Sequence, residues 1–447
     1  MFLFRPEAFT VTTPKILIRV LLAAIVAVSP AIVVAGQNAV RELIERAERH
    51  EKAGEWDKAY AVYDEIIKSH RGLAGIKDRQ LNILRRFWQE QRHADLGYRK
   101  EVLSLDYSQA LKLHGLIADA ILDASMQKTK VRPGQLLRKG IEELEAALAD
   151  RGFAASYLVE AKPEAVAEFR AFLKAKNVAA LGLNRDECRK TLREIALAGQ
   201  STLQLKPVVS VMELACGACY ALDEYTAYLT PQQYRELADS LKVAPMLFAN
   251  TVQFGMKIPE LGYMQITMFN ESTAMEVDDA FVQMNKGGLK GLILDLRGTP
   301  GGLFESSVEV ARRFLANGVI ASTENYDPKQ SLVYQSRNPA AWTVPLVVLV
   351  DGDTASAAEV LAGALKENGR ARLIGQPTFG KGSTQGLIKL PDALGGVPTG
   401  GLRLTIARFF SPKGVPYAGQ GIIPDLLVER SMDDFQLAEA ITELQRR

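Results

Sequence analysis

Ser356 is the residue of this chain best placed to act as a nucleophile. It follows an apolar run at 344–350 and the turn Asp351-Gly-Asp-Thr354. The run predicts a buried strand, and residues 355–366 predict a helix. A serine at the first turn of a helix lies beside unpaired N–H groups and the positive end of the helix dipole, which suit the oxyanion formed in acyl transfer. Taken alone, such a serine is more simply explained as a helix N-cap.

A second strand–turn–helix unit strengthens the catalytic interpretation. The strand predicted at 291–297 leads into Gly298-Thr-Pro-Gly-Gly302, whose glycines allow a substrate to approach the backbone closely. A helix is expected next, because Val308, Ala311 and Leu315 recur on one face. In a parallel sheet both turns would lie at the carboxyl ends of their strands, where sites usually form.

The catalytic half of the chain offers no imidazole as a base. The four histidines are His50, His70, His93 and His114. The candidate base is Lys381 in the segment Thr378-Phe-Gly-Lys-Gly-Ser-Thr-Gln385. A lysine can accept a proton only where burial lowers its pKa, and Ser–Lys pairs are an established variant of the serine triad. The simpler interpretation is a solvated lysine in a glycine loop.

The same segment nearly matches a phosphate-binding loop. Gly375-Gln-Pro-Thr-Phe-Gly-Lys381 has the glycine and lysine of that motif, but Gly382 replaces the hydroxyl residue that should bind Mg²⁺. Residues 385–391 also predict a strand rather than the required helix. Nucleotide binding is therefore not favoured.

Composition limits the remaining function classes. The 447 residues are 47% hydrophobic and 24% charged, with a net charge of +2, which is typical of globular proteins and gives no indication of nucleic-acid binding. Three cysteines cannot form a disulfide framework. Cys216 and Cys219 fall in the apolar run 208–222 and are expected to be buried thiols in a packed helix, with a disulfide as the alternative. No cluster has metal-ligand spacing, so neither a metal nor an organic cofactor is expected.

The first 36 residues predict export from the cytoplasm. Basic residues precede an apolar stretch that ends in small residues near Ala35, the pattern of a cleaved signal peptide. The stretch is also just long enough to be an uncleaved membrane anchor. In both cases we expect a periplasmic or secreted protein, anchored to the membrane in the second.

The mature chain divides into four parts by pattern. Residues 37–130 predict a helical region that resembles a tetratricopeptide hairpin around Gly54 and Ala59. Residues 131–243 predict further helices leading into an α/β domain at 244–430, and a C-terminal helix is expected at 431–447. One clear repeat unit is too few for a solenoid, so an ordinary helical domain is an equal alternative.

Several motifs in the second half occur together in one known family. They are Leu222-Asp-Glu-Tyr-Thr-Ala-Tyr-Leu-Thr-Pro231, Gly262–Phe269, Asp295-Leu-Arg-Gly-Thr-Pro-Gly-Gly302, Thr354-Ala-Ser-Ala-Ala-Glu359, Gly369-Arg370, Pro377–Gly382 with Gln385, Leu404–Gly414 and Gly421–Asp425. In order and spacing this set, spanning about 200 residues, resembles the C-terminal processing peptidases, or tail-specific proteases. The resemblance implies a crotonase-like α/β spiral of the ClpP/crotonase type and a Ser–Lys serine peptidase.

The resemblance also implies roles for individual residues. Ser356 would be the nucleophile, Lys381 the general base and Gln385 the residue that orients the lysine. The oxyanion hole would be formed by Gly301, Gly302 and Ala357, and the supporting residues would be Glu359 and Thr378.

Two features depart from the family pattern. Family members often carry Asp at the position of Glu367, which is more simply a solvated charge at a helix end. The family usually carries a PDZ domain that captures substrate C-termini, yet only about thirty residues separate Pro231 from Gly262, too few for such a domain. Recognition of substrate tails is therefore not carried over from the family, and the helical region is a hypothetical docking surface instead.

The sequence thus predicts an extracytoplasmic serine endopeptidase that cleaves proteins or peptides through an acyl-enzyme on Ser356. Its partners would be protein or peptide substrates, and an oligomer is compatible with the sequence. Two alternatives stay open. One is a catalytically inactive protease-like scaffold that binds peptides, and the other is an acyl-CoA enzyme on the related crotonase fold, which the N-terminal export segment disfavours.

Overall fold

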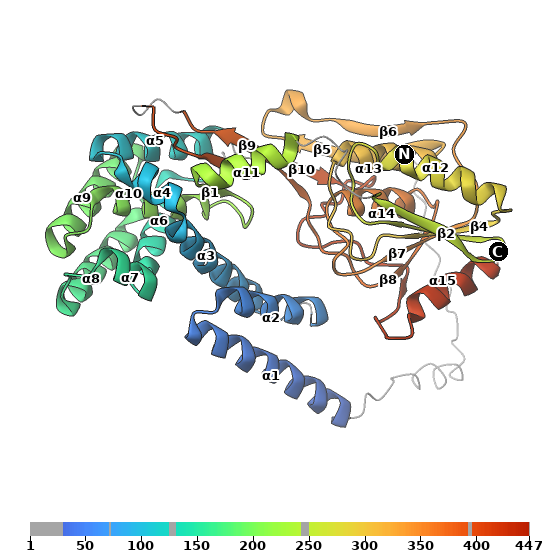
Figure 1. The fold of residues 1–447 in the computed structure, drawn as a ribbon, viewed down its shortest axis with the longest axis horizontal. Helices are drawn as coiled ribbons and strands as arrows, with labels where there is room; N and C mark the ends of the chain where they lie inside the picture. Colours follow the sequence, from blue (N-terminus) through green and yellow to red (C-terminus); the bar gives the residue numbers. More distant parts are fainter. Residues whose placement is uncertain (1–29, 71–72, 125–130, 243–249, 392–395, 447) are drawn as a thin grey trace, which may run out of the picture. The chain divides into compact units, whose positions relative to one another are not determined.

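The computed structural model describes residues 30–70, 73–124, 131–242, 250–391 and 396–446 (Figure 1). The chain forms two compact units, residues 1–87 and 88–447. Most of the predicted signal peptide or membrane anchor lies outside the described residues. Within them, no helix combines the length and the apolar character needed to cross a bilayer.

The first unit contains the predicted helical hairpin. Helix α1 (Pro30–Ala53) and helix α2 (Trp56–Ser69) are joined by a tight turn in which Gly54 has φ +75°, a conformation that favours glycine. Ala59 is fully buried between the two helices, beside Tyr63. The helix–turn–helix expected here is confirmed.

The second unit begins with a helical region. Its elements are α3 (Ile76–Ala94, which spans the boundary between the units), α4 (Leu96–Glu101), a 3₁₀ turn (Val102–Ser104), α5 (Tyr107–Ala124), α6 (Pro133–Ala147), α7 (Arg151–Tyr157), α8 (Pro163–Ala180), α9 (Arg185–Leu203), α10 (Pro207–Cys219) and α11 (Pro231–Lys242). Almost every residue of α10 is buried, because α5, α6 and α9 pack around it. Cys216 and Cys219 are free, buried thiols, as predicted.

Helices α6 and α10 touch through their backbones. A Cβ atom added to Gly217 would lie 2.4 Å from the Lys139 carbonyl oxygen and 2.7 Å from Gly140 Cα. A Cβ atom added to Gly140 would lie 2.5 Å from the carbonyl oxygen of Leu214. Only glycine permits this approach, so the two glycines fix the central contact of the helical region.

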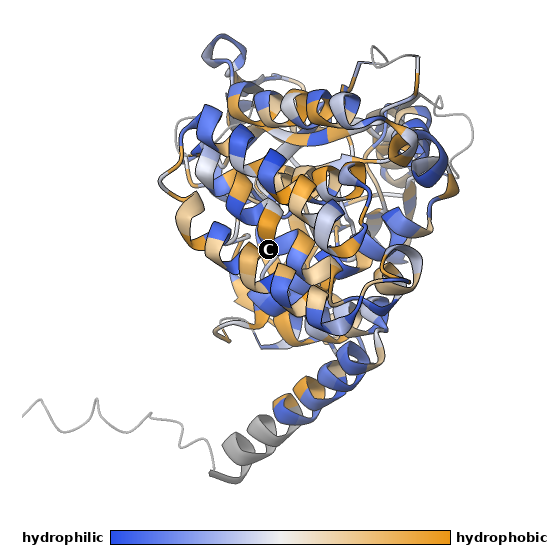
Figure 2. Ribbon diagram, turned by 90° about the vertical axis from the view of Figure 1, so that its left-hand side faces the viewer, coloured by the Kyte–Doolittle hydropathy of each residue, from blue (hydrophilic) through white to orange (hydrophobic). Residues whose placement is uncertain are grey.

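The helices around this contact are amphipathic. In Figure 2, hydrophobic and hydrophilic residues both occur along the same helices. The face predicted on α6 is buried as expected, with Leu137, Ile141 and Leu144 against the core. Burial of such a stripe, rather than helix propensity, supplies most of the stability of a surface helix.

The α/β region contains a six-stranded sheet in the order β11-β8-β7-β4-β3-β2. Its strands are β2 (Val252–Ile258), β3 (Leu261–Ile266), β4 (Gly291–Asp295), β7 (Leu346–Val350), β8 (Arg372–Gly375) and β11 (Leu426–Leu427). All neighbours are parallel except β2, which pairs antiparallel with β3 at the edge. The strands predicted at 291–297 and 344–350 are confirmed as β4 and β7, with shorter bounds.

Helices cover both faces of this sheet. Helices α12 (Thr273–Lys286), α13 (Phe304–Phe314) and α14 (Ala357–Glu367) share a core with one face. Helix α15 (Phe435–Gln445) packs on the other face, against Ile293, Val347 and Leu349. Since both faces are covered, β4 and β7 are apolar at nearly every position and fully buried, as expected for parallel strands.

A second sheet joins the α/β region to the helical region. Its strands are β1 (Ala227–Leu229), β5 (Asn317–Asn325), β6 (Val333–Arg337), β9 (Ser383–Lys389) and β10 (Gly401–Phe410), with a short 3₁₀ turn at Pro328–Gln330. Strand β10 pairs with β1 over residues 401–403 and with β9 over residues 401–408, and Leu402 and Leu404 enter the helical core. The second half pairs with β5. Strand β10 therefore brings the segment after α10 close to the α/β region.

Candidate active site

The two glycine- and aspartate-containing turns meet at one edge of the six-stranded sheet. They follow β4 and β7, which are parallel neighbours. The Ala355 N–H donates to the Thr299 carbonyl oxygen at 2.9 Å, and the Gly298 N–H donates to Asp351 Oδ1 at 3.0 Å. The expectation that both turns lie together at the carboxyl ends of their strands is confirmed.

Ser356 has a strained backbone at the start of α14. Its φ of +56° and ψ of −119° are rare for a residue with a side chain. Such a conformation costs about 1–3 kcal/mol and persists where the surrounding structure imposes it, which is common at functional sites. The serine is held at the sharp turn between β7 and α14 and is only partly buried.

Gly301 lies directly against this serine. With φ +105°, it would place an added Cβ atom 2.7 Å from Ser356 Cβ and 3.0 Å from the Ala357 nitrogen. Within the part of the chain that the structure describes, the Ala357 N–H has no hydrogen-bond acceptor. The Ala357 N–H could therefore donate a hydrogen bond to a substrate oxygen. Gly301 has no side chain, so it leaves space for that oxygen.

Gly302 is required for a different contact. Its φ is +138°, and an added Cβ atom would lie 2.0 Å from the Phe269 carbonyl oxygen. The flanking residues exchange hydrogen bonds with Phe269, whose N–H donates to Gly301 and whose carbonyl oxygen accepts from Leu303. Gly302 thus fixes the turn against the segment that follows β3, and this holds Gly301 beside Ser356.

The carboxylate of Glu359 connects the serine and lysine segments. It is fully buried and accepts four hydrogen bonds. Oε2 accepts the backbone N–H of Ser356 at 2.9 Å and that of Lys381 at 2.8 Å. Oε1 accepts the Thr378 hydroxyl at 2.6 Å and the Gly380 N–H at 2.7 Å. Burial raises the pKa of Glu359, although these four donors oppose the shift.

Thr378 extends this network to the next loop. Its hydroxyl oxygen accepts the Ile422 N–H at 2.7 Å while donating to Glu359. Both residues predicted to support the site therefore lie together beneath it. The structure brings Ser356, Lys381, Glu359 and Thr378 into one cluster built from α14 and the loop before β9.

The amine of Lys381 lies in a sheltered position. Its Nζ atom is 5.5 Å from the centre of the Tyr225 ring. Burial and the positive charge of Arg403 lower the pKa of Lys381, while Glu359 opposes the shift. The Tyr225 ring is attractive to the protonated amine, so ring and burial act in opposite directions. A general base requires a lysine with a lowered pKa, and burial lowers the pKa of Lys381.

The side chains of Ser356 and Lys381, the predicted catalytic pair, do not contact each other through a hydrogen bond. Among the described residues, no hydrogen bond joins Ser356 Oγ and Lys381 Nζ, although their backbones share Glu359. The Gln385 amide donates to Ser383 Oγ at 3.0 Å and to Thr405 Oγ1 at 3.3 Å instead of contacting the lysine. The orienting role of Gln385 stays a prediction.

Glu367 lies at the end of α14, away from this cluster of bonds. Its carboxylate accepts the Lys413 N–H at 2.8 Å and is partly exposed. That geometry agrees with a charge at a helix end.

Two residues facing the lysine were missed by sequence reasoning. Tyr225 stands in the segment 222–231, which carried the resemblance without an assigned role. Arg403 lies on β10 and donates from Nε to the Tyr225 carbonyl oxygen at 2.8 Å. No local pattern marks Arg403, because its place depends on the pairing of β10 with β1. Within the described ranges, no three His, Cys, Asp or Glu side chains group in a way that could hold a metal ion.

Comparison with known proteins assigns the α/β region to a family. Residues 260–428 match the family described as Peptidase family S41. A "Carboxyl-terminal-processing protease" of Synechocystis sp. is 39% identical over 175 residues, which cover 39% of each chain. The "Carboxy-terminal processing protease CtpA" of Bacillus subtilis is 38% identical over 179 residues, 40% of this chain and 37% of that relative.

One solved structure is similar to part of this chain. The "Photosystem II D1 C-terminal processing protease" is 33% identical, with a TM-score of 0.37, over 44% of this chain and 53% of that one. The chain thus spans about two fifths of the length of the curated relatives that it matches. Residues 260–428 therefore form a domain of peptidase family S41, and the curated relatives that share this domain are C-terminal processing peptidases.

Proposed function

We propose that this protein is a serine endopeptidase of the C-terminal processing type, with Ser356 as nucleophile and Lys381 as general base. The observation that carries the proposal is the shared carboxylate of Glu359, which accepts the backbone N–H groups of both residues. The free N–H of Ala357 and the close approach of Gly301 complete the features that acyl transfer needs.

The proposed reaction begins with a movement of the lysine side chain. Four rotatable bonds allow the Lys381 amine to leave the Tyr225 ring and approach Ser356 Oγ. The neutral amine takes the hydroxyl proton as Oγ attacks the substrate carbonyl carbon. The N–H groups of Ala357 and of the Gly301–Gly302 turn stabilise the resulting oxyanion. The lysine then donates the proton to the leaving amine.

The second half of the reaction releases the acyl group. A water molecule gives a proton to Lys381 and attacks the acyl-enzyme ester. The ester bond to Ser356 Oγ breaks, and the serine recovers its proton from the lysine. Gln385 would orient the lysine through the Ser383 and Thr405 hydroxyls, which it contacts in the structure.

The finer assignments of fold and location belong to the same proposal. The crotonase-like spiral is supported by the parallel sheet with helices on both faces, and the tetratricopeptide-like hairpin by the packing of α1 and α2. A periplasmic or secreted location, with or without a membrane anchor, rests on the residue pattern of positions 1–36.

A peptidyl p-nitrophenyl ester tests the proposal directly. The wild-type chain should release a burst of nitrophenolate and gain the mass of one acyl group on the peptide that contains Ser356. The Ser356→Ala variant should show neither, with an unchanged circular dichroism spectrum. The wild-type chain should also cleave an unfolded protein such as casein, and the Ser356→Ala variant should not.

The competing function is a catalytically inactive scaffold that binds peptides. The lack of a hydrogen bond between Ser356 Oγ and Lys381 Nζ among the described residues favours it. It predicts no burst and no acylated serine in the wild-type chain. That result with folded protein over the range from pH 6 to pH 10 would refute the peptidase assignment.

A further inference from the structure

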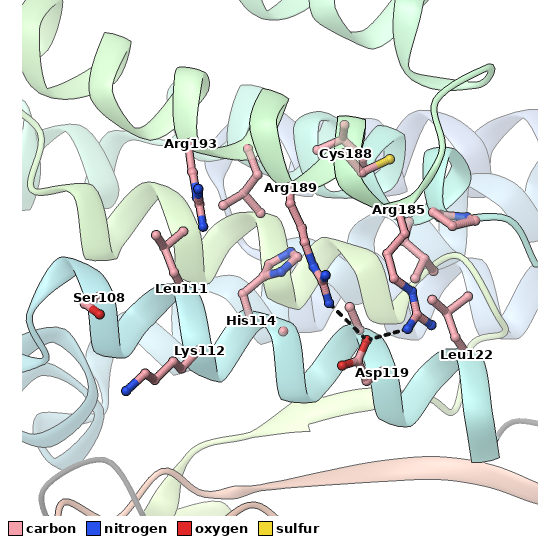
Figure 3. A pocket seen from close by; sticks show the side chains of 16 residues that line it. Ser108, Leu111, Lys112, His114, Asp119, Leu122, Arg185, Cys188, Arg189 and Arg193 are labelled. Carbon is pink, nitrogen blue, oxygen red and sulfur yellow. Dashed lines mark ion pairs between the residues drawn. The ribbon is translucent and has the colours of Figure 1, made fainter.

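A cavity of about 370 Å³ opens in the helical region between α5, α6 and α9 (Figure 3). Its volume is at the lower end of the range for small-ligand sites, roughly 300–1,000 Å³. No residue assigned to the active site lines it. The cavity therefore needs an explanation of its own.

Part of the lining of this cavity is apolar. Leu111 and Leu122 contribute from α5, Leu136 and Leu137 from α6, and Leu192 from α9. Leu136, Leu137 and Leu192 belong to the hydrophobic core, so they offer a fixed surface. An apolar group of one or two side chains would be removed from water there.

Another part of the lining carries positive charge. Arg185, Arg189 and Arg193 follow one another at intervals of four on α9, and Figure 3 shows their side chains extending toward α5. Lys112 lines the cavity from α5. The carboxylate of Asp119 is the only acidic group in the lining, and it lies 3.3 Å from Arg185 and 3.9 Å from Arg189.

Two of the four cations have no partner of opposite charge. In the described part of the chain, Arg193 and Lys112 form no ion pair. The cavity also contains His114, whose pKa is lowered to about 4 by burial and by the charge of Arg189. A neutral imidazole can donate a hydrogen bond to an anion without adding charge. The lining thus fits a ligand that joins one anionic group to a short apolar group.

We propose that this cavity binds the carboxyl-terminal end of a peptide. The terminal carboxylate would lie at Arg189 and Arg193, where a guanidinium can bind both of its oxygens. The last apolar side chain would lie on the leucines. A peptide terminus is preferred to a free fatty acid because this inference rests on the proposed function, in which peptides are the substrates. The site would then select chains by their end before cleavage at Ser356.

Peptide binding can be measured without hydrolysis. The full-length Ser356→Ala chain is titrated into a fluorescein-labelled peptide, Gly-Ser-Gly-Ser-Ala-Leu, with either a free carboxylate or a terminal amide. The free acid should bind at least tenfold more tightly than the amide, by fluorescence anisotropy. Arg193→Gln, added to this background, should weaken binding of the free acid about tenfold. Lys190→Gln, an exposed cation on α9 outside the cavity, is the matched control and should have no effect.

Several outcomes would overturn the inference. Equal affinity for acid and amide, or an Arg193→Gln variant with unchanged affinity, would remove the carboxylate from the site. Binding of decanoate without binding of the peptide would assign the cavity to fatty acids. If the wild-type chain gives a nitrophenolate burst and any of these results is also found, the cavity proposal is refuted while the peptidase function stands. Carboxylate-dependent binding in a chain without a burst would refute only the peptidase function.

Discussion

Ser356 and Lys381 donate their backbone N–H groups to the same atom, Oε2 of Glu359, at 2.9 and 2.8 Å. The two residues are separated along the chain by α14 and β8, yet one buried carboxylate fixes the backbone of both. A displacement of either segment would leave a buried charge with fewer donors, which is costly. The positions of the proposed nucleophile and the proposed base are therefore coupled through Glu359.

Replacement of Glu359 should damage activity and stability together. In Glu359→Gln an amide nitrogen would face N–H donors, so at least one buried hydrogen bond would be lost, at about 1–3 kcal/mol. Chemical denaturation should show that loss, and kcat/KM should fall about 10²-fold or more as the pair moves apart. Glu439→Gln, on α15 across the sheet, is the control and should behave like wild type. Full activity in Glu359→Gln would contradict the coupling.

Activity should rise with pH as Lys381 loses its proton. Because burial lowers the pKa of Lys381, the rise should occur below the pH expected for a free lysine. Arg403 contributes to the lowering, so Arg403→Gln should raise the pKa of Lys381 and move the rise to higher pH. Profiles of kcat/KM against pH would measure the shift. Arg408→Gln, on the same strand, should leave the profile in place.

A change of Lys381 to arginine should be as harmful as its removal. Arginine keeps its proton at any pH at which the protein is folded, so it cannot serve as a base. We expect turnover to fall about 10²–10⁴-fold in both Lys381→Arg and Lys381→Ala. Steady-state hydrolysis of a peptide ester would compare them. Retained turnover in the arginine variant would mean that the position supplies only positive charge.

A methyl group at Gly301 should block the nucleophile. In Gly301→Ala the new Cβ atom would meet Ser356 Cβ at 2.7 Å, so the serine or the turn must move. The burst of nitrophenolate should disappear. Gly298→Ala is a matched control in the same turn, since it also has positive φ, at +69°, but meets no atom within 4 Å. It should cost stability through backbone strain while keeping the burst.

The contact between α6 and α10 should tolerate no side chain at Gly217. Gly217→Ala places a Cβ atom 2.4 Å from the Lys139 carbonyl oxygen, and backbone atoms cannot yield as a side chain can. Overpacking of this kind costs about 1–3 kcal/mol. Gly115→Ala, within α5 and free of contacts within 4 Å, should instead gain up to about 1 kcal/mol of helix propensity. Thermal unfolding of both variants would show the opposite signs.

Most of the secondary structure near the site could be predicted because its signals are local. The apolar run before Asp351 and the glycines at 298–302 specify strand ends and turns within a few residues. The segment after Lys381 forms β9, as its pattern predicted, and this outcome disfavours a phosphate-binding loop. The buried thiols of Cys216 and Cys219 followed from the apolar run around them.

Partners that depend on distant pairing could not be predicted. The amide of Gln385 meets the Thr405 hydroxyl because β9 pairs with β10, and no pattern in either strand states that register. The cavity lined by Arg189 and Arg193 also exists only because three helices meet there. The spacing of four residues between Arg189 and Arg193 shows that they share one face of α9. It does not show which helices pack opposite that face.

The sequence by itself indicated Ser356 as a candidate nucleophile, Lys381 as a candidate base and the turns near them, since backbone conformation and capping act over three or four residues. Only the tertiary structure decided that Glu359 would tie Ser356 to Lys381, and that Tyr225 and Arg403 would shelter the amine. Burial and charge act through space, and the neighbours of a side chain are set by how strands and helices pack rather than by their order in the chain.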